Sequence, residues 1–179
     1  MKSIIFVPVR DYFKSRKRLF FKLLLPFIIG VIALVGALLF DIGNAEDVKA
    51  VFSEFIDVQI NIIAILISFS VAIITILVSA DNPNIQQLKD IDSEKSNYKP
   101  INSKQLSLFQ VLLSNIAYNV VVEIVYLICL IGIIIIKALL PLFILKYITA
   151  VCIFFIMHIL FVLLESVAQM YLTFWTKKA

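Results

Sequence analysis

Polar and ionisable side chains interrupt the two apolar stretches in the C-terminal half of the chain. They recur at intervals of three, four or seven residues, so on helices they would form two polar faces. The two sets are Asn115, Asn119, Glu123 and Tyr126, and His158, Glu165 and Gln169. Such groups are costly within a membrane and usually pair with one another. The chemistry they offer is hydrogen bonding and the binding of a proton or an ion.

The charge state of Glu123 is open. This side chain could be ionised and paired with protonated His158, or neutral and hydrogen-bonded to Asn119 or His158. A polar clamp that fixes helix register, within one chain or between subunits, is the first interpretation. A proton- or ion-linked site and a ligand pocket are the alternatives. Glu165 and Gln169 lie nearer the end of their stretch, where contact with solvent would explain them.

The sequence favours a protein without catalytic activity. It contains one histidine and two cysteines, Cys129 and Cys152, and both cysteines stand within apolar runs. A zinc site usually needs four such ligands, and intramembrane enzymes need a nucleophile with a base, metal ligands or several histidines. We therefore expect no catalytic residues, no metal and no cofactor. The loop of residues 80–104 has no phosphate-binding glycine loop and no dense basic patch with interleaved aromatic residues, so direct nucleic-acid binding is unsupported.

The elements that position these residues are membrane helices. Of the 179 residues 62% are apolar and only 16% are charged, whereas soluble domains carry about 25% charged residues. Four apolar stretches approach or exceed the roughly 20 residues that cross a bilayer. They are residues 23–40, 58–79, 117–136 and 147–167. We predict an all-α integral membrane protein in which residues 1–179 form a single four-helix domain, with residues 23–40 retained as a helix.

The distribution of positive charge predicts the orientation. Of the 16 lysines and arginines, 13 lie in the N-terminal segment, in the loop after the second stretch or at the C-terminus. Cytoplasmic segments carry this excess, so we expect both termini and residues 80–104 in the cytoplasm. The three exceptions are Lys49, Lys137 and Lys146. The acidic segment 41–57 is expected to be a small outer loop.

The third and fourth stretches predict a long antiparallel hairpin. Helical patterning extends from Leu106 to Ile136 and resumes after Pro141 until Trp175. A helix over residues 106–136 would be about 46 Å long and would protrude into the cytoplasm. With a constant rise in both helices, Asn115 lies level with Glu165. The same register places Glu123 level with His158, so we predict that their side chains come within reach.

Small and weakly polar residues predict the faces on which the first two helices pack, because they allow close helix approach. These residues are Gly30, Ala33, Ala37, Asn61, Ser68 and Thr75. A hydrophilic pore lining is the alternative for the second helix. Residues 1–22 form a basic, partly aromatic segment that is expected at the lipid interface. The interface residues are Arg16, Lys17, Arg18, Lys22 and, at the far end of the chain, Trp175.

The loop of residues 80–104 contains a turn signal at residues 81–84 and a short helical pattern at residues 85–90. Its remainder mixes charges of both signs with few aromatic residues, so we expect it to be mobile or ordered by a partner. A cytoplasmic protein partner is therefore predicted to bind at this loop and at the inner ends of the hairpin. The lipid bilayer and further copies of the chain are the other expected partners.

Size, four-helix topology and an Ile-, Phe-, Lys- and Asn-rich composition resemble the small membrane subunits of bacterial anti-phage defence systems, of which the KwaA subunits of Kiwa systems are an example. The resemblance extends over the whole chain but includes no signature motif. It implies a multi-pass protein of the bacterial inner membrane that senses infection, forms a homo-oligomer and acts through a cytoplasmic effector. We therefore expect a non-catalytic membrane subunit that anchors or signals to a partner. A homo-oligomeric ion channel or pore-forming effector is the alternative.

Overall fold

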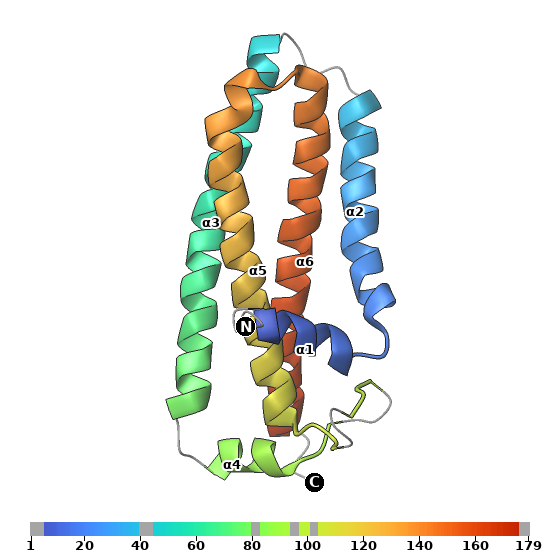
Figure 1. Ribbon diagram of the computed structural model, residues 1–179, viewed down its shortest axis with the longest axis vertical. Helices are drawn as coiled ribbons and strands as arrows, with labels where there is room; N and C mark the ends of the chain where they lie inside the picture. The colour runs from blue at the N-terminus through green and yellow to red at the C-terminus, as the bar shows by residue number, and fades with distance from the viewer. Residues whose placement is uncertain (1–5, 40–44, 80–82, 94–96, 101–103, 176–179) are drawn as a thin grey trace. The chain divides into compact units, whose positions relative to one another are not determined.

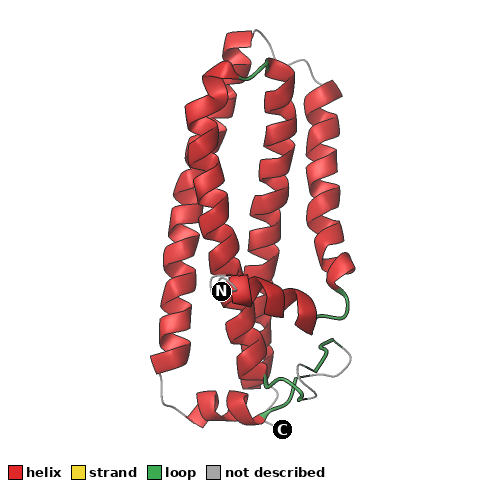
Figure 2. Cartoon of the chain, viewed as in Figure 1, coloured by secondary structure: helices red, strands yellow, loops and turns green. Residues whose placement is uncertain are grey.

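In the computed structural model, every regular element among the described residues is a helix (Figure 2). The structure describes residues 6–39, 45–79, 83–93, 97–100 and 104–175. Figure 1 shows the helices α1 (Val7–Ser15), α2 (Leu19–Leu39), α3 (Ala45–Ser79), α4 (Pro83–Asp90), α5 (Leu108–Ile136) and α6 (Leu142–Trp175), with a short 3₁₀ turn, η2 (Lys137–Leu139), between the last two.

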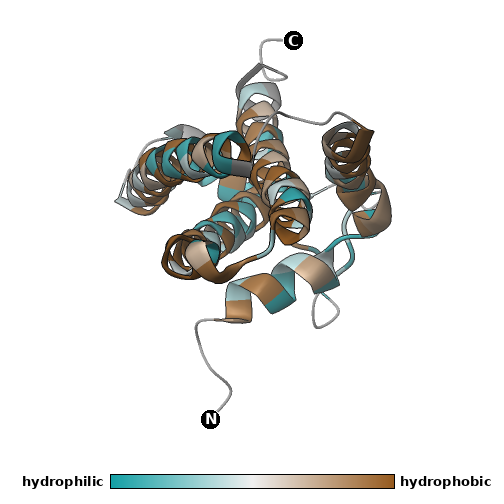
Figure 3. Ribbon diagram, turned by 90° about the horizontal axis from the view of Figure 1, so that it is seen from above, coloured by the Kyte–Doolittle hydropathy of each residue, from teal (hydrophilic) through white to brown (hydrophobic). Residues whose placement is uncertain are grey.

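Four of these helices are long and apolar enough to cross a membrane: α2, α3, α5 and α6. Most of their residues are hydrophobic (Figure 3), and large side chains such as Phe20, Phe27 and Ile32 of α2 are exposed. Helices α3, α5 and α6 have 35, 29 and 34 residues, so at 1.5 Å per residue each exceeds the roughly 30 Å hydrocarbon core. Four long apolar helices of this kind indicate a multi-pass membrane protein.

Helix α3 begins earlier than the sequence predicts. The acidic segment expected as an outer loop is helical from Ala45 onward. Two features explain the difference. Glu46 and Asp47 stand in the first helical turn, where carboxylates interact favourably with the helix dipole. Val48, Phe52 and Phe55 then recur at helical spacing and give the segment an apolar face.

The first of two compact units consists of Met1–Leu19, Ser68–Val122 and Phe161–Ala179. One core cluster in it contains Leu77, Ile85, Leu112 and Ile116. A second contains Tyr12, Tyr118 and Val162, with the rings of Tyr12 and Tyr118 stacked 3.8 Å apart. The non-spanning helices α1 and α4 thus contribute apolar side chains to the same cores as the spanning helices.

The described parts of the loop after α3 are held by specific hydrogen bonds, whereas the sequence suggested a mobile or partner-ordered segment. Helix α4 coincides with the predicted helical pattern, and its Ile85 and Leu88 are buried. Beyond it, the backbone N–H of Ser93 donates to the carbonyl of Leu106 at 2.8 Å. The Gln105 side-chain amide donates to the carbonyl of Ser93 at 2.9 Å. These interactions satisfy backbone groups that composition alone cannot reveal.

The second compact unit consists of Phe20–Ile67 and Glu123–Leu160. Within it, α2 approaches α6 closely at Gly30. A Cβ atom built on Gly30 would lie 3.3 Å from both the Ala150 carbonyl oxygen and the Phe154 Cβ atom. The absence of a side chain at Gly30 is therefore what permits this approach, as in other small-residue helix contacts.

The residues predicted to pack α2 and α3 divide into two groups. Gly30 is buried, and Ala33 and Ala37 are half-buried. In contrast, Asn61, Ser68 and Thr75 are exposed, so they do not belong to the buried face of α3, and the packing role assigned to them stays a prediction. The buried positions of α3 are Phe52, Ile56, Gln59, Ile63, Ser70 and Leu77. The buried face of α3 thus consists mainly of larger apolar side chains.

Substitution of Gly30 by valine should destabilise the protein, because the new side chain would overlap Ala150 and Phe154. Gly36→Val in the same helix is the matched control, since a Cβ atom at Gly36 meets nothing within 4 Å. We expect Gly30→Val to lower the free energy of unfolding by about 2 kcal/mol more than the control does. Thermal unfolding in detergent measures the difference. Equal effects of the two substitutions would contradict the close contact.

Candidate functional site: the Arg16 cluster

A buried arginine stands at the junction between the non-spanning segments and the spanning helices of the first unit. Arg16 follows α1 directly and has an extended backbone conformation, with φ −99° and ψ 137°. It pairs with Tyr98 in an isolated antiparallel bridge. The N–H of Lys99 donates to the carbonyl of Ser15 at 2.6 Å, and the N–H of Lys17 donates to that of Asn97 at 3.1 Å. Two segments about 80 residues apart are thereby joined through their backbones.

The guanidinium of Arg16 binds one residue from each of two spanning helices. Its Nη1 atom donates to both carboxylate oxygens of Glu165 on α6, at 2.9 and 2.8 Å. Its Nη2 atom donates to Oδ1 of Asn115 on α5 at 2.6 Å. These are charge-assisted hydrogen bonds, which are stronger than bonds between neutral groups. A single side chain therefore connects the end of α1 with α5 and α6.

A second set of hydrogen bonds fixes the partners of the arginine. Nδ2 of Asn115 donates to Oε1 of Gln169 at 3.2 Å. Nε2 of Gln169 donates to Oε1 of Glu165 at 3.1 Å and also to the hydroxyl of Tyr98. The amide groups of Asn115 and Gln169 are both used as donor and acceptor, which fixes their orientation.

Two tyrosines enclose the charged groups. The Arg16 guanidinium lies 4.2 Å from the centroid of the Tyr12 ring and 5.8 Å from that of Tyr98, so cation–π attraction adds to the hydrogen bonds. Burial raises the pKa of Tyr12 and Tyr98, and the positive charge of Arg16 opposes that rise. Both phenols therefore stay neutral at ordinary pH. We call Arg16, Asn115, Glu165, Gln169, Tyr12 and Tyr98 the Arg16 cluster.

The burial of the ion pair between Arg16 and Glu165 indicates a structural role for the Arg16 cluster. The Arg16 side chain is 1% exposed and that of Glu165 is 23% exposed. Most hydrogen-bonding groups of the Arg16 cluster are bonded to other residues of the chain, which indicates a structural role. Among the described residues, no group of three or more His, Cys, Asp or Glu side chains could hold a metal ion.

The structure brings together three of the seven residues predicted to form an intramembrane polar cluster: Asn115, Glu165 and Gln169. Contact with solvent is therefore a minor part of the explanation for Glu165 and Gln169, because each has partners within the chain. Tyr126 lies in the second unit, where its hydroxyl hydrogen-bonds to Oε1 of Gln59 and donates to the Cys152 carbonyl at 3.0 Å.

The remaining members, Asn119, Glu123 and His158, are all buried, with exposed fractions of 1%, 0% and 4%. Glu123 and His158 both belong to the second unit. The ring of Phe154 is parallel to that of His158, with centroids 6.2 Å apart. A direct contact between Glu123 and His158 stays a prediction. Of the two cysteines, Cys152 is buried and Cys129 is exposed, and both are free thiols.

Arg16 corrects the sequence assignment of the lipid-interface residues. It is 3% exposed and therefore cannot present its charge to lipid headgroups, whereas Lys17 and Arg18 are exposed and Lys22 is half-buried. The side chain of Trp175 lies outside the described residues. The sequence analysis also did not identify Tyr12, four residues before Arg16, or Tyr98 as members of the Arg16 cluster. A tyrosine one helical turn before a basic residue is a weak signal, and the pairing with Glu165 spans 149 positions.

No family model, curated protein or solved structure matches the chain. The resemblance to membrane subunits of Kiwa-type defence systems therefore stays an expectation from the sequence.

Replacement of Arg16 by glutamine should destabilise the protein more than any other single basic-to-glutamine change in residues 6–22. It would leave Glu165 partly buried without its cation, and breaking a buried pair costs about 3 kcal/mol. Arg18→Gln is the control, because Arg18 is exposed. In a double-mutant cycle, Glu165→Gln should remove much of the penalty of Arg16→Gln. Independent, additive effects in thermal unfolding would show that the pair contributes no coupling energy.

Replacement of Glu123 tests the polar clamp separately. Glu123→Leu removes all hydrogen-bonding capacity at a fully buried position, whereas Glu123→Gln keeps the shape and most of that capacity. We expect leucine to impair assembly severalfold more than glutamine, as measured by the yield of monodisperse protein in detergent. If Gln abolished activity while assembly survived, the charge itself would be functional and the clamp interpretation would fail.

Proposed function

We propose that this protein is a non-catalytic subunit of the bacterial inner membrane that oligomerises and holds, or signals to, a cytoplasmic protein partner. The Arg16 cluster is the observation that carries this proposal. It fixes α1 and the Tyr98 segment to α5 and α6 through buried, charge-assisted bonds. A membrane protein that only needs to span the bilayer does not require its flanking segments to be held in this way.

The proposed orientation places both termini and residues 80–104 in the cytoplasm, and the hairpin of α5 and α6 extends into it. The positive-inside rule supports this assignment, because 13 of the 16 basic residues lie in the corresponding segments. The lengths of α5 and α6 support the extension beyond the hydrocarbon core.

The surface proposed for the partner consists of α4 and the following loop. Its apolar residues Ile85 and Leu88 are buried, so the exposed part is polar. Among the described residues of this surface, the exposed charged ones are Lys89, Asp90, Asp92, Lys99 and Lys104. Mixed charge on a fixed backbone favours recognition of a complementary protein surface, since such charges set specificity and orientation.

Homo-oligomer formation is supported by α3. Its exposed positions include Asn61, Ser68 and Thr75, and small or hydroxyl-bearing residues of this kind are typical of contacts between membrane helices. The role implied by the resemblance, a sensor of infection in anti-phage defence, fits a membrane platform of this design and is part of the proposal.

The same exposed face of α3 favours a second candidate, a homo-oligomeric channel or pore-forming effector. A single four-helix subunit is too small to enclose an aqueous pore, so copies of the chain would have to surround the conduit. Most residues of the predicted polar stripes of α5 and α6 are buried, and Glu165 and Gln169 are half-buried, which makes the stripes less suitable as a lining. In this second candidate, the exposed polar residues of α3 would line the conduit.

Purification of the natively expressed protein in mild detergent, followed by native mass measurement, distinguishes the candidates. We expect a homo-oligomer with a soluble protein bound in fixed ratio. Charge reversal at the proposed surface, Asp90→Lys with Lys99→Glu, should reduce the bound partner at least about tenfold. Glu54→Lys, which is an exposed charge reversal that the proposed orientation places outside, is the control. A homo-oligomer without partner that conducts ions in liposomes would overturn the proposal in favour of the pore.

A further inference from the structure

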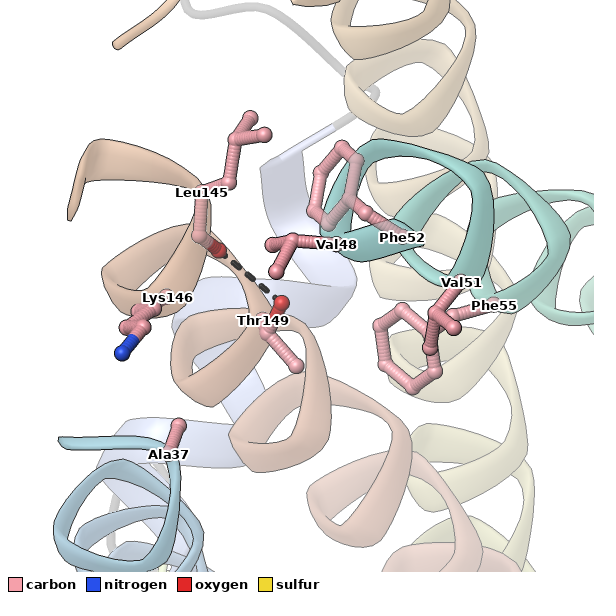
Figure 4. Close-up of a pocket in the computed structure, with 8 residues that line it drawn as sticks. All are labelled: Ala37, Val48, Val51, Phe52, Phe55, Leu145, Lys146 and Thr149. Atoms are coloured by element: carbon pink, nitrogen blue, oxygen red, sulfur yellow. Dashed lines mark hydrogen bonds between the residues drawn. The ribbon is translucent and has the colours of Figure 1, made fainter. Parts of the chain in front are cut away.

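Two neighbouring cavities open at one end of the second unit, where the apolar stretches of α3, α5 and α6 reach their ends. One has a volume of about 140 Å³ and is lined by Ala37, Val48, Val51, Phe52, Phe55, Leu145, Lys146 and Thr149 (Figure 4). The other has a volume of about 240 Å³ and is lined by Lys49, Phe52, Ser53, Lys137, Ala138 and Leu145. Phe52 and Leu145 belong to both linings, so the two cavities are adjacent.

The apolar part of the lining comes from three different helices. Figure 4 shows Val48, Phe52 and Phe55 of α3 on one side, and Leu145 and Thr149 of α6 opposite them. The hydroxyl of Thr149 donates to the Leu145 carbonyl at 2.9 Å, so this side chain adds no unused hydrogen-bond donor to the lining. Helix α2 contributes Ala37 to the same lining. These walls suit a hydrocarbon chain.

The polar part of the lining is positively charged. Lys49 and Lys137 line one cavity and Lys146 lines the other, and each lysine comes from a different element. Nζ of Lys137 donates to the Ser53 hydroxyl at 2.9 Å, which leaves two of its three protons for another acceptor. Ser53 in turn donates to the Lys49 carbonyl at 2.8 Å.

The described acidic residues of this end belong to neither lining. Glu46, Asp47, Glu54 and Asp57 are on α3 and are exposed at other positions of the helix. The three lysines are also the only basic residues that the positive-inside count places on the outer side. Basic residues that depart from this bias, and that gather around apolar cavities, are suited to bind an anion from outside the chain.

We propose that these cavities form a binding site for an anionic phospholipid. Lys49 and Lys137 bind the headgroup phosphate, Lys146 adds positive charge at the neighbouring cavity, and one acyl chain lies against Phe52, Phe55 and Leu145. Basic pockets between membrane helices bind anionic lipid headgroups on the cytoplasmic side of membranes, and these cavities offer the same combination of positive charge and apolar wall. The mixture of charged rim and apolar wall favours a whole lipid over a free phosphate ion. This site is independent of the proposed cytoplasmic partner.

Native mass measurement of the full chain with added lipid tests the site. The probes are dioleoyl phosphatidylglycerol, dioleoyl phosphatidylcholine with the same chains, and glycerol phosphate as the free headgroup. We expect phosphatidylglycerol to be retained in preference to the other two. Each lysine near an anionic lipid contributes about 1 kcal/mol, so Lys49→Gln and Lys137→Gln should each weaken retention about fivefold.

Matched variants separate the site from general charge effects. Lys89→Gln removes the same charge from α4 in the other unit and should leave retention unchanged. Lys137→Arg should retain most of the binding. Ala37→Phe fills one cavity without a change of charge and should also weaken retention, which keeps the test valid if a lysine variant folds poorly. Equal retention of phosphatidylcholine, equal competition by glycerol phosphate, or an unchanged result for the cavity variants would overturn the proposal.

Discussion

The bond between Arg16 and Glu165 is the constraint on which the first unit depends. A guanidinium that is 1% exposed must have an anion beside it, because an unpaired buried charge costs several kcal/mol. Its partner lies 149 residues away, on the last helix. The side-chain oxygen of Asn115 must therefore face Arg16. The side-chain oxygen of Gln169 must then accept a hydrogen bond from the Asn115 amide nitrogen. The backbone pairing of Arg16 with Tyr98 follows from the same placement, since the chain has to leave α1 in an extended conformation.

The cluster contributes more to specificity than to net stability. The cost of removing two charges from water offsets much of their attraction, and apolar replacements of equal volume can be as stable. An apolar contact would tolerate several positions of α1 against α5 and α6. Hydrogen bonds from one guanidinium to a carboxylate and to an amide are directional, and we infer that they select one position. This selection gives the flanking segments a defined surface, which is the property a docking platform requires.

The sequence was sufficient for the spanning helices and for α4, because long apolar runs and helical periodicity are local signals. The sequence did not predict which side chains contact those helices from other elements. Counting positive charges treats every arginine alike, so Arg16 was grouped with the exposed Lys17 and Arg18. The stripe of Asn61, Ser68 and Thr75 was assigned to internal packing because small residues often pack, but Thr75 donates to the Val71 carbonyl within its own helix and needs no burial. Asn115, Glu165 and Gln169 were recognised by their spacing, while the residue that joins them is on another element.

The basic residues of the two units illustrate opposite solutions to the same electrostatic problem. In the first unit the chain supplies its own anion, and the cluster around Arg16 is closed by Glu165 and two amides. In the second unit Lys49, Lys137 and Lys146 border cavities whose described linings contain no carboxylate. A cation with an internal partner fixes the structure, and a cation that faces a cavity is available to a ligand. Because bilayer lipids are always present at the ends of membrane helices, an anionic lipid is the ligand that would meet these lysines first.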